Sequence, residues 1–145
     1  MTLFYDDLDN HLSKAADLAQ ASIPMGMLLA WCARMQLLSP AFLQAHDQLV
    51  LQVQVEEARG SELLIACGGR LEKKYFTAQG QDFLDNFYPT YWQLWVSEFG
   101  AQPYAIKDTW DNYRRIAPAL TQALLGQPAR PKSGLLGKLT HFLRG

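Results

Sequence analysis

The chain has 145 residues, a length typical of one domain. Apolar residues make up 49% and charged residues 19%, which excludes a disordered chain and predicts a sizeable core. The formal net charge of −1 excludes a general nucleic-acid-binding protein, because such proteins carry a basic surface. The charge is uneven: seven acids and three bases over 1–60 give −4, and four bases without an acid over 127–145 give +4.

The start of the chain predicts an extended segment followed by two helices. We expect residues 1–10 to be extended and a first helix to cover about 8–20, where apolar residues recur at helical spacing. A central, apolar helix follows. Pro24 is expected to open it, because proline fits the first turn of a helix, with Ser22 nearby as a cap.

The next segments predict two more helices. Ser39 can cap a helix and Pro40 fits its first position. The apolar spacing then continues without a turn signal as far as Gly60, so one helix is favoured, although its last residues also alternate like a strand. Residues 61–67 make about two further helical turns, which Gly68 and Gly69 end.

The second half predicts two long aromatic helices after a polar connector over 70–76. Thr77 can cap the first helix and Asp108 the second. Pro89 and Pro118 fall inside these helices and are expected to kink them, because proline removes a helical hydrogen bond. The first helix carries an aromatic ladder at four-residue spacing, formed by Phe83, Phe87, Tyr91 and Trp95.

The end of the chain differs from the rest. Residues 127–134 have the composition of a linker, and 135–143 predict a short basic amphipathic helix that packs back or docks a partner. The predicted fold is mainly α: a compact single-domain bundle of about five to seven helices, two of them proline-kinked, over 1–126, followed by the linker and tail helix over 127–145.

Cysteine usage and hydropathy predict a cytoplasmic protein. Cys32 and Cys67 lie in apolar runs without metal-ligand spacing, so both are expected to be reduced. The first ten residues lack the basic and apolar regions of a signal peptide. The longest apolar stretch, 23–29, is too short to span a bilayer, so we expect no stable membrane insertion.

Residues that could carry chemistry are scattered along the chain. His11, His46 and His141 have no neighbours at metal-ligand spacing. No nucleophile elbow, phosphate-binding loop or dinucleotide fingerprint occurs. We therefore expect no catalytic residue, no metal ion and no cofactor, and a protein that is not an enzyme.

Acidic residues are the best candidates for a contact surface. Asp6, Asp7 and Asp9 cluster near the start, with His11 close by. They could form a contact for a basic partner, or they could be a solvated first turn whose acids complement the helix dipole. Both interpretations stay open from sequence.

Several segments resemble an uncharacterised family of small bacterial cytoplasmic domains. They are FYDDLDNHL at 4–12, IPMGMLLAWCARMQLLS at 23–39, GSELLIACGGRL at 60–71 and the aromatic stretch over 77–91. In that family a Thr-His pair usually precedes the Ile-Gly-Met run, whereas here Pro24 stands within it and the histidine is absent. The resemblance does not extend to the tail.

The resemblance implies an immunity protein, since such families accompany type VI or polymorphic toxin systems. It implies a cognate protein toxin as partner, whose active site this protein would occlude. The polar positions that the resemblance carries over are Tyr5, Asp6, Asp7, His11 and Glu62. With the neighbouring acids Asp9, Glu56 and Glu57, they are the residues expected to bind the partner.

Two other hypotheses remain from sequence. The protein could be an adaptor or regulatory module that docks a partner through its tail helix. It could also carry a small-molecule or enzymatic site in a polar cleft, which would require Tyr5, Asp6, Asp7, His11 and Glu62 to converge. The sequence makes no prediction of the oligomeric state.

Overall fold

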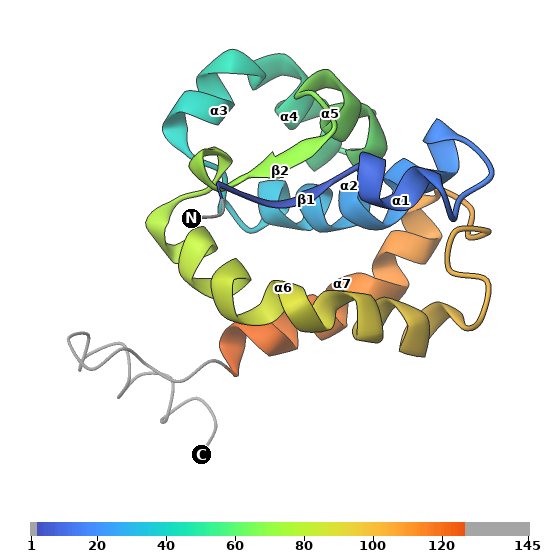
Figure 1. The fold of residues 1–145 in the computed structure, drawn as a ribbon. Coiled ribbons are helices and arrows are strands. Elements are labelled where there is room, and N and C mark those ends of the chain that lie inside the picture. The colour runs from blue at the N-terminus through green and yellow to red at the C-terminus, as the bar shows by residue number, and fades with distance from the viewer. Residues whose placement is uncertain (1–2, 127–145) are drawn as a thin grey trace.

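The structure, a computed structural model, describes residues 3–126; the linker and tail helix predicted over 127–145 lie outside that range (Figure 1). Within it, seven α-helices and one two-stranded sheet confirm the mainly α prediction. The elements in chain order are β1 (Phe4–Asp7), α1 (Asp9–Leu12), α2 (Leu18–Arg34), α3 (Pro40–Ala45), α4 (Asp47–Gln54), α5 (Gly60–Ala66), β2 (Arg70–Glu72), a 3-10 turn (Lys73–Tyr75), α6 (Ala78–Phe99) and α7 (Trp110–Leu125).

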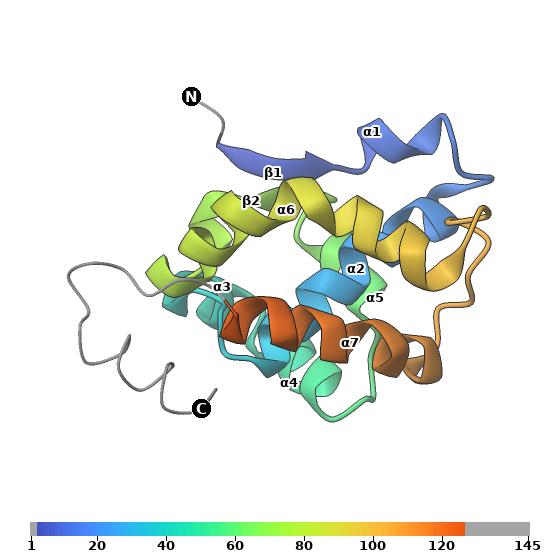
Figure 2. The same cartoon turned by 90° about the horizontal axis from the view of Figure 1, so that it is seen from below.

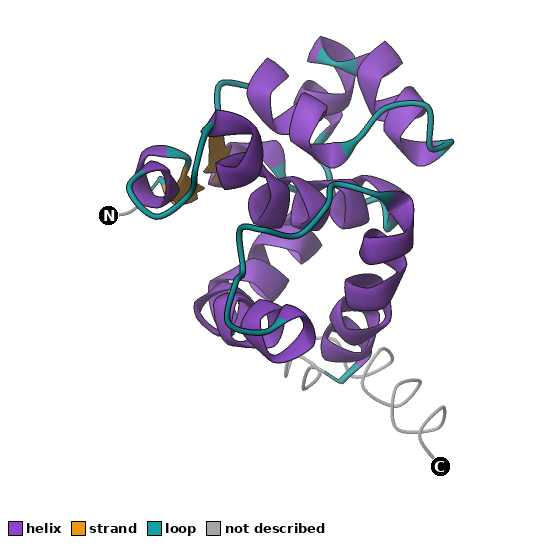
Figure 3. Ribbon diagram, turned by 90° about the vertical axis from the view of Figure 1, so that its right-hand side faces the viewer, coloured by secondary structure: helices purple, strands orange, loops and turns teal. Residues whose placement is uncertain are grey.

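Helix α2 is the centre of the molecule. Its residues 21–33 are all buried, as expected of a helix that is apolar on every side. Figure 1 shows α3, α4 and α5 above it and α6 and α7 below it. In Figure 3 the two short strands lie at one edge of this helical body. The core therefore surrounds α2, and the other elements form its outer layer.

The start of α2 corrects two predictions. The helix expected over 8–20 is wrong, because α1 is a single turn and the chain bends before Leu18. Asp17 has an extended backbone, and its carboxylate accepts the N–H of Gln20 at 2.8 Å, so it caps α2. Pro24 therefore lies inside the helix and does not open it.

Capping residues define the next helices, and one irregular residue divides them. The Ser39 side chain accepts the N–H of Phe42 and Pro40 occupies the first turn, as predicted. The single helix expected from Pro40 onward is wrong, because the backbone at His46 leaves the helical region and separates α3 from α4. Helix α5 confirms the prediction for 61–67 within one residue at each end.

A small sheet replaces the predicted polar connector. Strand β2 pairs antiparallel with β1, placing Asp6 opposite Leu71 and Asp7 opposite Arg70. Gly68 and Gly69 have φ values of 100° and 77°, and this left-handed backbone turns the chain from α5 into β2. The pairing fixes β1 on the helical body.

The long helices follow the predicted aromatic pattern. Thr77 caps α6 by accepting the N–H of Gly80 at 3.0 Å. The ladder is formed, with ring centroids 4.8 Å apart for Phe83 and Phe87. Pro89 and Pro118 lie inside α6 and α7, which continue past them.

The predicted cap of the last helix is wrong. Thr109, one residue after Asp108, accepts the N–H of Asn112 and caps α7. Asp108 instead accepts a hydrogen bond from the Ser61 hydroxyl at the start of α5. Because the carboxylate of Asp108 accepts this long-range hydrogen bond, it does not cap α7.

Helices α2 and α5 touch through their backbones. A Cβ at Gly26 would lie 2.5 Å from the Ser61 nitrogen, and a Cβ at Gly60 would lie 1.8 Å from the Gly26 oxygen. Both distances are far inside van der Waals contact, and backbone atoms cannot rotate away as a side chain would. The crossing therefore requires glycine on both helices.

We predict that Gly60→Ala lowers the free energy of unfolding by at least about 3 kcal/mol, because the added methyl group forces the two helices apart. Urea denaturation measures this. Ala78→Gly, at an exposed position in the first turn of α6, is the control and should cost about 1 kcal/mol or less. Equal losses for the two variants would contradict the close crossing.

Candidate functional site

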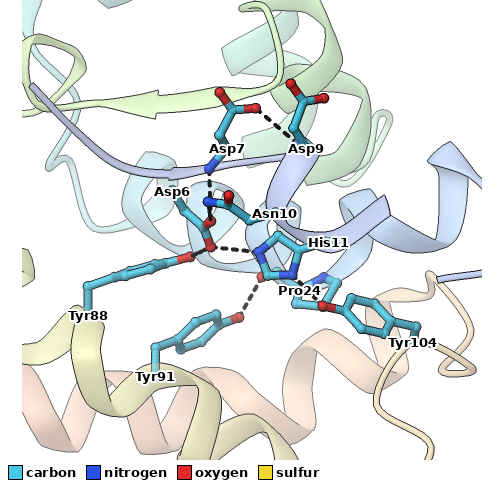
Figure 4. A network of polar contacts seen from close by, with 9 residues as sticks. All are labelled: Asp6, Asp7, Asp9, Asn10, His11, Pro24, Tyr88, Tyr91 and Tyr104. Carbon is cyan, nitrogen blue, oxygen red and sulfur yellow. Dashed lines mark hydrogen bonds and ion pairs between the residues drawn. The ribbon is translucent and has the colours of Figure 1, made fainter. Parts of the chain in front are cut away.

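A closed network of side chains surrounds the buried carboxylate of Asp6 (Figure 4). His11 Nε2 lies 2.7 Å from Asp6 Oδ2, and the Asn10 amide nitrogen lies 3.1 Å from Asp6 Oδ1. The Tyr88 hydroxyl donates to Oδ2, and the backbone N–H of Asp7 donates to Oδ1 at 2.8 Å. Donors from β1, α1 and α6 therefore converge on one carboxylate.

His11 connects Asp6 to the loop between α6 and α7. Because a carboxylate only accepts hydrogen bonds, Nε2 of His11 donates to Asp6. Its Nδ1 contacts the hydroxyl of Tyr104. In a neutral ring that donates through Nε2, Nδ1 accepts a hydrogen bond from this hydroxyl. The Trp92 ring packs against the imidazole, with centroids 5.8 Å apart. Both ring nitrogens of His11 therefore have protein partners.

The network contains the ionised carboxylate of Asp6 and the protonated phenols of Tyr88 and Tyr104. Burial alone would raise the pKa of Asp6, but hydrogen bonds from His11, Tyr88 and Asn10 outweigh it and hold that pKa below its ordinary value. Burial, and then the charge of Asp6, raise the pKa of Tyr88 well above its ordinary value and that of Tyr104 to about 12. At neutral pH Asp6 is ionised and both phenols keep their protons.

This arrangement supports a structural role for Asp6 and His11. A general base must reach a substrate proton, whereas the Asp6 oxygens already accept four hydrogen bonds. The network joins β1 and α1 to α6 and to the loop before α7. These two residues, which were predicted to bind a partner, hold the N-terminal segment in place.

The two tyrosines of this network could not be predicted from the sequence. Tyr88 and Tyr104 lie 82 and 93 residues from their partners Asp6 and His11. No local spacing connects such positions, and both tyrosines fit the general aromatic pattern of the core. The only local signal was that Asp6, Asn10 and His11 lie within six consecutive residues of the sequence.

Tyr5 and Asp7 are held outside the network. The register shifts between Phe4 and Asp6, so a β-bulge at Tyr5 turns two consecutive side chains toward α6. The Tyr5 hydroxyl donates to Asp85 at 2.8 Å. Asp7 pairs with Arg70 at 2.9 Å on the neighbouring strand. The bulge therefore explains why Tyr5 and Asp6 both reach α6.

The three predicted glutamates lie on other parts of the surface. Glu56 pairs with Arg34 at 3.0 Å and with Arg114, which ties α7 to the end of α2. Glu57 is exposed, and Glu62 caps its own helix by accepting the N–H of Arg59. Among the described residues, Glu62 therefore does not join Asp6 and His11 in one polar cleft, which the enzymatic hypothesis required.

A groove beside α1 brings the remaining predicted acids together. This acidic groove has a volume of about 500 Å³ and lies between α1, the start of α2, the end of α5 and β2. Three carboxylates and one guanidinium line it, for a formal charge of −2; they belong to Asp7, Asp9, Glu72 and Arg70.

Apolar side chains form much of the rest of the acidic groove. Leu12, Leu18 and Ile65 border it and are 39%, 47% and 47% exposed. Cys67 also lines it, as a free thiol, in agreement with the sequence prediction. Burial raises the pKa of this thiol to about 11, so it is protonated at neutral pH. The groove offers apolar contact area and negative charge.

We predict that Asp6→Ala lowers the free energy of unfolding at neutral pH by about 3 kcal/mol, since His11, Asn10 and Tyr88 lose a buried acceptor. The folded pKa of Asp6 lies below its ordinary value of 3.8, so the carboxylate stabilises the fold fully above that value and less as pH falls through the folded pKa. The difference in the free energy of unfolding between wild type and variant should therefore become smaller in acid.

Urea denaturation from neutral pH to about pH 3 measures this gap. Asp9→Ala, at an exposed acid outside the network, is the control and should change stability by about 0.5 kcal/mol or less. A gap that stays constant over the whole range would contradict the ionised state of Asp6 in the network.

Residues 3–126 contain neither a candidate metal site nor a candidate membrane-spanning helix. Within this range, no group of three or more metal-ligating side chains could hold an ion, and no helix has both the length and the apolar character that crossing a bilayer requires.

Comparison with known proteins adds one relationship. No curated protein and no solved structure matches the chain. A family model matches residues 4–116, and the chain therefore belongs to the domain of unknown function DUF7832.

Proposed function

We propose that this protein is a non-enzymatic binding protein, and that the acidic groove receives a basic, partly apolar segment of its partner. The observation that carries the proposal is the groove itself, where a formal charge of −2 lies beside three exposed aliphatic side chains. Complementary charge steers association, and apolar contact at the centre of an interface supplies affinity.

We further propose that the partner is a cognate bacterial toxin. The support is the resemblance described above, which implies an immunity protein. Asp6 and His11 are engaged with other side chains, and Asp7 pairs with Arg70, so Asp9 is the strongest candidate for the contact surface among the clustered acids. Glu56, which pairs with two arginines, is a weaker candidate. The mechanism is occlusion: the bound protein covers the toxin's active site.

Co-expression with the toxin encoded beside this protein tests the proposal. The wild-type chain should restore growth and form a stable complex. Asp9→Lys combined with Ile65→Lys should weaken the complex about 100-fold, or about 2.8 kcal/mol, because it reverses one charge and places a second positive charge in the apolar contact. Both residues are exposed, so the fold should be kept.

Asp111→Lys is the matched control, because it reverses an exposed acid at the start of α7, outside the acidic groove and outside the residues expected to bind the partner. It should leave growth and binding unchanged. Failure of the wild-type chain to rescue growth or bind the toxin would overturn the toxin proposal. Equal weakening by the control would show that general negative charge, and not the groove, attracts the partner.

A further inference from the structure

A second groove lies at the other end of the molecule. This apolar groove, with a volume of about 490 Å³, is formed by the end of α2, by α3 and by α4. Leu43 and Leu51 border it and are 38% and 59% exposed, with buried Leu38 and Val50 below them. Single exposed leucines are common, but two beside one apolar groove indicate a binding surface.

We propose that residues 135–143 of this chain occupy the apolar groove of the same molecule. This inference is independent of the partner of the acidic groove. The segment's sequence predicts an amphipathic helix with one apolar face, and such a face docking between helices is a common mode of recognition. The residues of that face are Leu135, Leu136, Leu139, Phe142 and Leu143.

The place where the described chain ends favours this occupant. Trp31 on α2 donates its indole N–H to Thr121 on α7 at 3.1 Å. Thr121 is five residues before Gly126, and Trp31 is two residues before Ala33, which lines the apolar groove. In Figures 1 and 2 the last turn of α7 and α3 both lie toward the left end of the molecule, with α3 above α2 and α7 below it in Figure 1.

Eight residues, 127–134, connect the end of the described chain to the proposed occupant. Residues 127–134 extend up to about 26 Å, and a nine-residue helix is about 14 Å long. The acidic groove is a less direct destination, because α1 lies on the opposite side of Figure 1 from the last turn of α7. The position of the last turn of α7 therefore favours the apolar groove over the acidic groove as the site of residues 135–143.

The charged residues near the apolar groove are compatible with residues 135–143 as its occupant. Residues 127–145 carry four bases and no acid. Of the described residues, no lysine or arginine lines the apolar groove, whereas Asp47 does, and Glu57 is exposed on the loop after α4. The nearest arginine on α2, Arg34, pairs with Glu56 and lies over the Trp110 ring. Among the described lining residues, a basic segment would therefore meet the carboxylate of Asp47 and no positive charge.

A double-mutant cycle in the full chain tests the inference by thermal unfolding. Leu51→Gln and Leu139→Gln should each lower Tm by about 3 °C, because each removes one side of an apolar contact. The double variant should lose little more than either single variant, since the shared contact is already gone. The matched control is Leu18→Gln, at an exposed leucine of the acidic groove, whose effect should add fully to that of Leu139→Gln.

Three outcomes would overturn the inference. Additive losses for Leu51 and Leu139 would show that they do not touch. Coupling between Leu18 and Leu139 would place the segment in the acidic groove. A Tm and a molecular mass that rise with protein concentration, and fall back in Leu139→Gln, would show that the segment docks on a second copy.

A disulfide experiment gives an independent readout. In a Cys67→Ser background, Leu51→Cys with Leu139→Cys should oxidise to an intramolecular disulfide, which requires the two Cα atoms to come within about 7 Å. Leu18→Cys with Leu139→Cys should stay reduced under the same conditions. The reverse pattern would contradict the proposed docking.

Discussion

The backbone contact between Gly26 on α2 and Gly60 on α5 is the constraint on which the rest of the structure depends. It brings the two helices together more closely than any side chain would allow. It also sets Ser61 against Asp108, which positions the loop before α7. At its far end α5 turns through two left-handed glycines into β2, and β2 holds β1. The crossing thus determines where the N-terminal segment can lie.

The Asp6 network fixes that segment a second time, from the other side. Strand β1 pairs with β2 on one edge, while Asp6 and His11 attach the segment to α6 and to the loop carrying Tyr104. A buried carboxylate is costly unless its oxygens are hydrogen-bonded, and here four donors satisfy it. The result is a rigid border to the acidic groove, beside which Asp9 remains exposed.

Local physics explains what the sequence could predict. Ser39 and Thr77 each precede a helix and bond to its first turn, so their capping roles follow from nearby residues alone. The aromatic ladder of α6 likewise follows from four-residue spacing. The mainly α fold class is the sum of such local signals, and it was correct.

Long-range pairing explains what the sequence could not predict. The residues of β2 form a strand only because β1 supplies their hydrogen bonds. Tyr88 on α6 and Tyr104 in the loop after it meet Asp6 and His11 only through the tertiary packing of these elements. Likewise Asp108 was expected to cap a helix, but Ser61 from a distant helix engages its carboxylate.

Hydrogen exchange of the full chain, alone and with the toxin encoded beside it, is the most direct test of binding through the acidic groove. Binding through the acidic groove predicts slower exchange of backbone amides over 7–18 and 65–72, with little change over 44–62. Protection confined to 44–62, around Glu56 and Glu57, would contradict it, and so would the absence of any protection in a mixture that contains active toxin.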